Sequence, residues 1–262
     1  MVAIIAMIYN YKNIPIYYKT VGKGSAIVLL HGFLESSNMW ESLIPHLAKN
    51  NLIITIDFPG HGKSGVISEI HTMELMAEVV DRTLQHLQIS SAAFVGHSMG
   101  GYVALAFAEL FPEKVEKIIL LNSTPAADSD DRKENRDRAL KIIDQNPQAY
   151  ISMAIRNLFA ESSFEKFTSE IKSLIMEAHS FPTEGIKAAI KGMRERKDRT
   201  KVLKDFNKGK YMIIAKEDPI LPISDAKKLG EFCGVSVKII EGGHMSMIEN
   251  HDFIVKYLRF IG

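Results

Sequence analysis

A serine stands between two glycines in the pentapeptide Gly96-His97-Ser98-Met99-Gly100. An apolar run of strand length precedes this segment, and small residues compatible with a helix follow it. A strand, a tight turn and a helix in that order would hold the serine hydroxyl above the strand end, next to the free N–H groups of the helix N-terminus. The Gly-x-Ser-x-Gly pattern alone is weak evidence, because an ordinary serine in a glycine-rich turn gives the same letters.

A serine hydroxyl attacks at neutral pH only when a base accepts its proton and an acid orients that base. Among nine histidines, His244 directly follows the last strand-like run, after two glycines that let the loop turn. Asp218 follows the preceding strand-like run, with Glu217 as the adjacent alternative. Asp57 also ends a strand-like run, but its Pro-Gly-His-Gly setting is typical of a turn. We therefore predict Ser98 as nucleophile, His244 as base and Asp218 as acid.

Attack on a carbonyl group builds negative charge on its oxygen, which two preorganised N–H donors must stabilise. The backbone amide of Met99, directly after the serine, is one predicted donor. The amide of Phe33 is the other, because Phe33 follows the first strand-like run of the predicted parallel sheet. We also predict that the substrate pocket is lined by His31, His97, Phe159 and Met193.

The composition is that of an ordinary globular protein. Of 262 residues, 46% are hydrophobic and 24% charged, and the net charge of +1 gives no argument for binding to nucleic acid or a membrane surface. The single cysteine, Cys233, excludes an intramolecular disulfide and fits a reducing compartment. The apolar start, 1–8, lacks a basic region and a clear cleavage site, so we interpret it as a strand rather than a signal peptide and expect a cytoplasmic protein.

Strand-like and helical patterns alternate along much of the chain. This alternation predicts βαβ units and a mainly parallel sheet, with an antiparallel hairpin at the start. Helices are expected from Ser36 or Ser37 to about Lys49, over 72–88 and over 247–260. The expected strands are 3–9, 14–20, 26–30, 52–56, 92–95, 115–121, 211–215 and 235–240.

The alternation stops at about Ser123. A dense mixed-charge run, 128–138, follows, and we interpret it as a solvent-exposed face. From there to about 205 the spacing is helical. We therefore predict an α/β core of residues 1–124 and 206–262 that carries a helical cap, 125–205. The arginines of 192–199, near the end of this insertion, either meet a substrate carboxylate or form a solvated helix end.

Taken together, these segments resemble the α/β-hydrolase superfamily, in its cap-bearing serine esterase-like branch, from about residue 14 onward. The resemblance implies an α/β fold with an eight-stranded, mostly parallel sheet flanked by helices and a helical cap inserted after strand 6. Serine at position 98 argues against the haloalkane dehalogenase and epoxide hydrolase branches, which use aspartate there. The resemblance rests on His31-Gly32-Phe33, the segment 57–64, the pentapeptide around Ser98, Asp218 with Pro222, and Gly243-His244.

This resemblance implies a serine hydrolase that cleaves small or medium carboxylic esters, or lactones, through an acyl-enzyme. The single-glycine oxyanion loop goes with such acyl groups in related esterases, and the Gly192-Met193 segment is similar to one in enol-lactonase and aryl-esterase relatives. Alternatives stay open: a C–C bond hydrolase or an aminopeptidase of the same fold, or a ligand-sensing binding protein with slow turnover. We expect a small-molecule ester as the partner, no nucleic acid, no membrane, no metal and no cofactor. The sequence makes no prediction of the oligomeric state.

Overall fold

The centre of the protein is one sheet of eight strands, seen in a computed structural model that describes residues 4–261. The strands are β1 (Ile5–Tyr11), β2 (Ile14–Gly22), β3 (Ser25–Leu30), β4 (Asn51–Ile56), β5 (Ala92–His97), β6 (Val115–Leu121), β7 (Gly209–Ala215) and β8 (Ser236–Ile240). Their order across the sheet is β1-β2-β4-β3-β5-β6-β7-β8. β2 is antiparallel to both neighbours, and the strands from β4 to β8 are parallel. The predicted eight-stranded, mostly parallel sheet is confirmed. Residue 3, where the first strand was expected to begin, lies outside the described residues.

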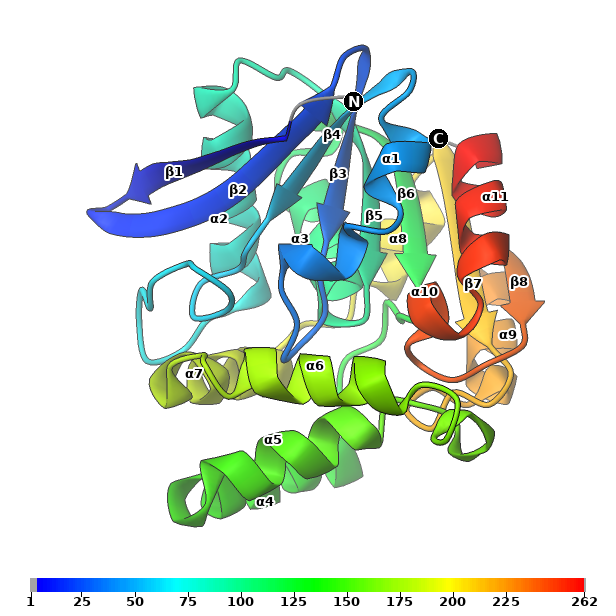
Figure 1. Cartoon of the computed structure of the whole chain (residues 1–262). Helices are drawn as coiled ribbons and strands as arrows, with labels where there is room; N and C mark the ends of the chain where they lie inside the picture. The colour runs from blue at the N-terminus through cyan, green and yellow to red at the C-terminus, as the bar shows by residue number, and fades with distance from the viewer. Residues whose placement is uncertain (1–3, 262) are drawn as a thin grey trace.

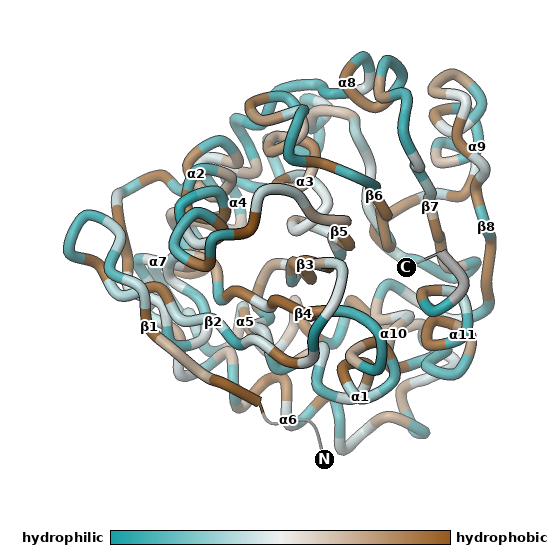
Figure 2. The backbone as a smooth tube through the Cα atoms, turned by 90° about the horizontal axis from the view of Figure 1, so that it is seen from above, coloured by the Kyte–Doolittle hydropathy of each residue, from teal (hydrophilic) through white to brown (hydrophobic). Residues whose placement is uncertain are grey.

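Helices cover both faces of this sheet. They are α1 (Ile44–Leu47), α2 (Met73–His86), α3 (Met99–Leu110), α4 (Asp130–Gln145), α5 (Pro147–Arg156), α6 (Thr168–Ala178), α7 (Thr183–Arg194), α8 (Thr200–Asp205), α9 (Ile223–Cys233), α10 (Ser246–Glu249) and α11 (His251–Ile261). Viewed from above, α2, α3 and α8 lie on one side of the hydrophobic central strands, and α1, α10 and α11 lie on the other (Figure 2). Within residues 4–261, no helix combines the length and apolar character needed to cross a membrane.

The central strands are apolar at nearly every position because helices cover the sheet on both sides. Successive side chains of a strand point to opposite faces. In β3, Val28 and Leu30 therefore join the core beneath α2 and α3. Ile27 and Leu29 join the second core, beneath α1 and α11. This double burial explains why the strands appear in the sequence as continuous apolar runs.

Two local predictions have different outcomes. The predicted hairpin is present, and its two-residue turn places Lys12 and Asn13 at φ 49° and 67°, the left-handed values that a tight hairpin turn requires. The predicted continuous helix up to Lys49 is wrong, because a 3₁₀ turn, Ser37–Trp40, is followed separately by the short α1. A continuous helix would need an N–H from Pro45, and proline has none.

The helices α4 to α7 lie across the carboxyl ends of the parallel strands, on the side of the molecule away from both chain ends (Figure 1). Two glycines of α7 lie in close contact with the backbone of the core. A Cβ on Gly185 would lie 2.5 Å from the Cα of Gly60, and a Cβ on Gly192 would lie 1.8 Å from the carbonyl oxygen of His71. The N–H of His71 also donates to the Ala188 carbonyl at 3.0 Å. Side chains larger than hydrogen are therefore excluded at both contacts. α8 packs against α3 and α9.

Candidate active site

The turn between β5 and α3 holds Ser98 in a strained backbone conformation. Its φ of 50° and ψ of −116° lie outside the regions that residues with a side chain ordinarily adopt. Two glycines make the tight turn possible: a Cβ on Gly96 would lie 2.4 Å from the carbonyl oxygen of Gly100, and a Cβ on Gly100 would lie 2.2 Å from that of Leu30. The N–H of Ser98 donates to the Leu121 carbonyl at 3.0 Å, which ties the turn to the neighbouring strand.

The imidazole of His244 is fixed by a buried carboxylate. Its Nδ1 lies 2.8 Å from Oδ2 of Asp218, and the other carboxylate oxygen accepts the N–H groups of Ile220 and Leu221 at 2.8 and 3.0 Å. Burial by itself would raise the pKa of Asp218, but the attraction and hydrogen bond of His244 lower it overall. An ionised Asp218 keeps the imidazole proton on Nδ1. Nε2 is buried and has no hydrogen-bond partner among the residues described, so it is available to accept a proton.

The neighbouring carboxylate, Glu217, faces away from His244 and accepts the Ser162 hydroxyl at 3.0 Å. Asn122, a residue that the sequence analysis did not identify, completes the surroundings of Asp218. Its side-chain N–H donates to Oδ2 of Asp218 at 2.8 Å, and its own oxygen accepts the Ser246 hydroxyl at 2.5 Å. A polar side chain directly after β6 was the available signal, since the carboxyl ends of parallel strands meet at one edge.

Phe33 and Ser98 line the same cavity, and Met99 directly follows Ser98 in the chain. Phe33 is in the loop after β3, and Met99 is the first residue of α3. Neither N–H donates to a protein acceptor within residues 4–261. The first N–H groups of a helix have no partner inside the helix and carry partial positive charge. This arrangement can therefore stabilise negative charge that develops beside Ser98.

A cavity of about 510 Å³ opens over Ser98, between the sheet edge and the helices above it. From the core side, Phe33, Ser98 and His244 line it. Met193, a predicted pocket residue, lines it from α7. Its walls on α4 and α5 include Arg132, Asn135, Arg136, Ala139, Ile142, Tyr150 and Met153.

Three of the four predicted pocket residues, His31, Phe159 and His97, do not line this cavity. His31 turns back into its own loop, where Nε2 accepts the N–H of Phe58 at 2.9 Å and Nδ1 lies 2.7 Å from the Gly32 carbonyl oxygen. Phe159 packs in the core beneath α1 and α11, with its ring centroid 6.4 Å from that of Phe167. The prediction is wrong for these two side chains because both are buried in the protein interior and do not reach the cavity.

His97 points instead to Glu35, which the sequence analysis did not identify. His97 Nδ1 lies 3.0 Å from Glu35 Oε2, and both side chains are buried. The same oxygen accepts the N–H of Gly32 at 2.6 Å, and His97 Nε2 lies 3.0 Å from the carbonyl oxygen of His244. Burial opposes both charges, but their attraction dominates and leaves the pKa of His97 raised and that of Glu35 lowered. A protonated His97 thus ties the loop of His244 to the loop of Gly32.

Two further histidines are buried behind the loop of Phe33. The His61 ring lies 5.4 Å from the ring of His31 and 5.9 Å from that of Phe33, between centroids. Burial, with the nearby charge of His31, lowers the pKa of His61 to about 3. Burial lowers the pKa of His71 to about 4. The folded protein therefore keeps both imidazoles neutral at pH values where exposed histidines are charged.

We expect the free energy of unfolding to fall as the pH drops from 7 to 5. In the unfolded chain each histidine takes up a proton near pH 6.5, whereas folded His61 and His71 stay neutral down to about 3 and 4. The unfolded state binds more protons across this range, so each histidine removes about 2 kcal/mol of stability at pH 5. Urea unfolding at pH 7 and pH 5 measures the loss.

The variant His61→Asn tests this assignment, because it should lose less stability than the unmodified protein between the two pH values. The comparison between variant and unmodified protein is needed because the pKa of His97 is raised. His97 therefore stabilises the folded state at low pH, which opposes the effect of His61 and His71 on the free energy of unfolding. An equal loss in the variant and the unmodified protein would contradict the role of His61.

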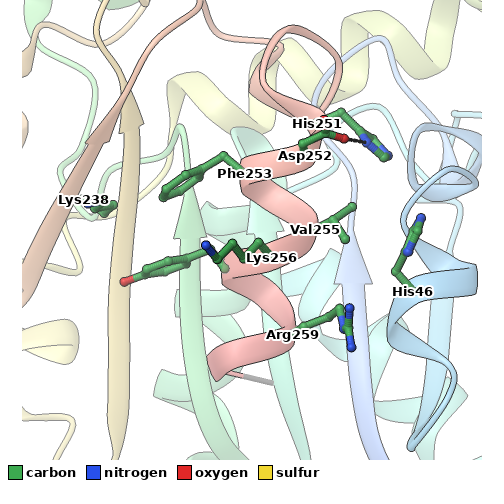
Figure 3. A pocket seen from close by; sticks show the side chains of 9 residues that line it. His46, Lys238, His251, Asp252, Phe253, Val255, Lys256 and Arg259 are labelled. Carbon is green, nitrogen blue, oxygen red and sulfur yellow. Dashed lines mark hydrogen bonds and ion pairs between the residues drawn. The ribbon is translucent and has the colours of Figure 1, made fainter.

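A second hollow, of about 580 Å³, lies beside α11 (Figure 3). His46 of α1 and Lys238 of β8 border it. Phe253 lies on the side of the helix toward Lys238, whereas Val255 and Arg259 lie on the side toward His46 (Figure 3). These side chains do not converge on one point, so this hollow is not a candidate active site.

Comparison with known proteins supports this view of the fold. The family model of the alpha/beta hydrolase fold matches residues 25–251. The uncharacterized hydrolase YugF of Bacillus subtilis is 30% identical over 257 residues, which cover 92% of this chain and 91% of YugF. The dihydrolipoyllysine-residue acetyltransferase component of the acetoin cleaving system of Pseudomonas putida is 29% identical over 238 residues, or 86% of this chain. The match spans only 60% of the length of that relative.

Among solved structures, a thermophilic esterase from Thermogutta terrifontis with malate bound has a TM-score of 0.90 and 27% sequence identity, over 97% of this chain and 96% of the esterase. An enol-lactonase from Burkholderia xenovorans has the same fold, with a TM-score of 0.89 at 20% identity over 96% of this chain and 98% of the lactonase. Because the family model spans most of the sequence and YugF matches it nearly from end to end, the chain belongs to the α/β hydrolase family.

Proposed function

We propose that the protein hydrolyses small or medium carboxylic esters, lactones included, through an acyl-enzyme on Ser98. One observation carries the proposal. Ser98 and His244 line the same cavity, and Nδ1 of His244 is held 2.8 Å from Asp218 while Nε2 has no partner among the described residues. The esterase neighbour, at 27% identity, supports ester chemistry. The single, buried thiol of Cys233 fits the expected reducing, cytoplasmic location.

In the first half of the proposed reaction, the Ser98 hydroxyl attacks the carbonyl carbon while Nε2 of His244 takes its proton. The charge on the carbonyl oxygen is stabilised by the amides of Phe33 and Met99. His244 then donates the proton to the leaving alcohol, and the acyl group stays on Ser98. In the second half, water attacks this ester with His244 again as base, and Asp218 stabilises the imidazolium in both steps.

Hydrolysis of 4-nitrophenyl esters with acyl chains from acetate to dodecanoate tests the proposal. We expect kcat/KM to be highest for short and medium chains, because the single-glycine oxyanion loop His31-Gly32-Phe33 goes with such acyl groups in related esterases. A parallel series of 4-nitroanilides, which contain amide bonds, should react far more slowly. Absence of ester turnover above the uncatalysed rate, or a preference for the anilides, would overturn the assignment.

The buried ion pair of Glu35 and His97 is expected to act as a positioning unit. Glu35→Gln keeps the size of the side chain but removes the charge that holds His97 protonated, so the loop of His244 loses its tie to the loop of Gly32. We expect kcat to fall about 10- to 100-fold with little change in KM, because misplacement of a catalytic group by about 1 Å has effects of this size. Steady-state kinetics on 4-nitrophenyl butyrate separates the two constants.

Glu41→Gln is the matched control for this variant. It makes the same charge change in an exposed carboxylate that pairs only with Lys19 among the described ion pairs, and it should leave kcat within about twofold. A purely structural role would lower the fraction of folded enzyme, so rates are expressed per active site titrated with a phosphonate. Unchanged kcat per titrated site in Glu35→Gln would show that the pair does not position His244.

A further inference from the structure

The wall of the cavity that α4 forms is cationic at one end and apolar at the other. Arg132, Asn135, Arg136, Ala139 and Ile142 all line it, and their spacing of three and four residues places them on one face of the helix. In the charged run 128–138, which was expected to be a solvent-exposed face, Asp128 is buried and Arg132 and Arg136 are half-buried beside this cavity. Nothing in the composition of the run distinguishes the face that turns inward.

Three arginines at the cationic end share one buried carboxylate. Asp128 Oδ1 lies 2.6 Å from Nη1 of Arg196 and 4.0 Å from Nη1 of Arg132. Its Oδ2 lies 3.2 Å from Nε of Arg136. Arg196 is further fixed over the ring of Tyr102, at 4.1 Å from the ring centroid. Three guanidinium groups against one carboxylate leave a net charge of +2.

The other charged groups around the cavity do not cancel this excess. Glu35 is the only carboxylate among the described residues that line the cavity, and it is paired with His97. Arg138 pairs with Glu134 at 2.7 Å. Of the three arginines on Asp128, Arg196 is nearly fully buried, at 2% exposure, whereas the side chains of Arg132 and Arg136 are 32% and 21% exposed. Of these three, Arg132 and Arg136 line the cavity and remain accessible from it, whereas Arg138, which also lines it, is paired with Glu134.

We propose that Arg132 and Arg136 bind a free carboxylate of the substrate, so that the preferred substrates are esters or lactones that carry an anionic carboxylate. This inference rests on the proposed ester hydrolysis. Arginine binds carboxylates through its fork of N–H donors, and such charge-assisted hydrogen bonds are stronger than neutral ones. Ala139 and Ile142, farther along the same face, provide an apolar surface for the carbon chain of the substrate.

Two pairs of substrates, each differing only in charge, test the proposal. Mono-4-nitrophenyl adipate and its methyl ester place the carboxylate, or its neutral counterpart, on the acyl side. 4-Acetoxybenzoate and its methyl ester place it on the leaving-group side. In at least one of the two pairs, we expect kcat/KM for the anionic ester to be about tenfold or more above that of its neutral partner. This preference should fall as the NaCl concentration is raised from 0.02 to 0.5 M.

Arg132→Gln and Arg136→Gln should each reduce that preference about tenfold or to near unity, mainly by lowering kcat/KM for the anionic ester. The ratio of two rates on one preparation does not depend on the fraction of folded protein. Arg194→Gln is the matched control, because it makes the same charge change on α7. Arg194 pairs with Asp137 and Glu195 and does not line the cavity, so the ratio should not change.

The outcomes separate the two proposals. If neither member of either pair is hydrolysed, the proposed ester hydrolysis itself fails. If the neutral esters react as well as the anionic ones, or if Arg194→Gln alters the ratio as much as Arg132→Gln and Arg136→Gln do, ester hydrolysis stands and the carboxylate site is overturned.

Discussion

Ser98→Ala is expected to lower kcat/KM for 4-nitrophenyl butyrate by about 10⁴-fold or more, which is the usual effect of removing the nucleophile of a serine triad. Without the hydroxyl no acyl-enzyme forms. Water acting with His244 and the amides of Phe33 and Met99 can supply only the residual rate. The fold should be unaffected, because the side chain of Ser98 makes none of the hydrogen bonds identified among the described residues.

The measurement combines kinetics with covalent labelling. A fluorophosphonate should add one mass increment to the unmodified protein, on the peptide that contains Ser98, and none to Ser98→Ala. Ser162→Ala is the control: Ser162 is exposed and bonds to Glu217, so activity and labelling should be retained. Undiminished ester turnover in Ser98→Ala would refute the acyl-enzyme mechanism.

Asp218→Asn is expected to lower kcat by about 10³- to 10⁴-fold at pH 7. The side chain keeps its shape, but the amide N–H can donate a hydrogen bond to Nδ1 of His244, which favours the tautomer that carries the proton on Nε2. That imidazole cannot accept the proton of Ser98. The variant also lacks the negative charge of the carboxylate, which stabilises the imidazolium that forms during the reaction.

Glu217→Gln provides the comparison, because it makes the same chemical change one residue away. Its carboxylate bonds to Ser162 rather than to His244, and kcat should stay within about twofold. Equal losses in the two variants, or a larger loss in Glu217→Gln, would show that Asp218 is not the acid that orients His244. Both variants should unfold at a similar urea concentration to the unmodified protein if the effect is chemical.

The parallel sheet could be predicted because its strands are buried on both faces. β3 contains the apolar run Ala26–Leu30 and β6 contains Ile118–Leu121, and the predicted ranges of these two strands agree with the structure to within one residue. The region from Ser36 to Lys49 was less predictable. Its apolar residues have helical spacing, but the missing N–H of Pro45 outweighs that pattern.

The candidate site was predictable where position along a strand decides position in space. Asp218 and His244 each follow a strand of the parallel sheet, and the structure brings them within hydrogen-bond distance. Their catalytic roles remain predictions. Glu35 and His97 are separated by 62 residues, and only the folded chain shows that they meet. The inward face of α4 depends likewise on how the helix is rotated over the cavity, which a run of mixed charge does not specify.

The helices over the cavity differ in how well they tolerate amino-acid substitution, because α7 makes two close glycine contacts with the core. Gly185 and Gly192 meet the core backbone so closely that a methyl group at either position would displace the helix. α4 and α5 have no such glycine contact with the core among the described residues, yet they supply nearly half of the residues that line the cavity. A mutant library aimed at new substrates should therefore randomise α4 and α5 and leave both glycines of α7 untouched. During evolution, substitutions in α4 and α5 would change substrate preference, while the close packing of α7 on the core stays the same.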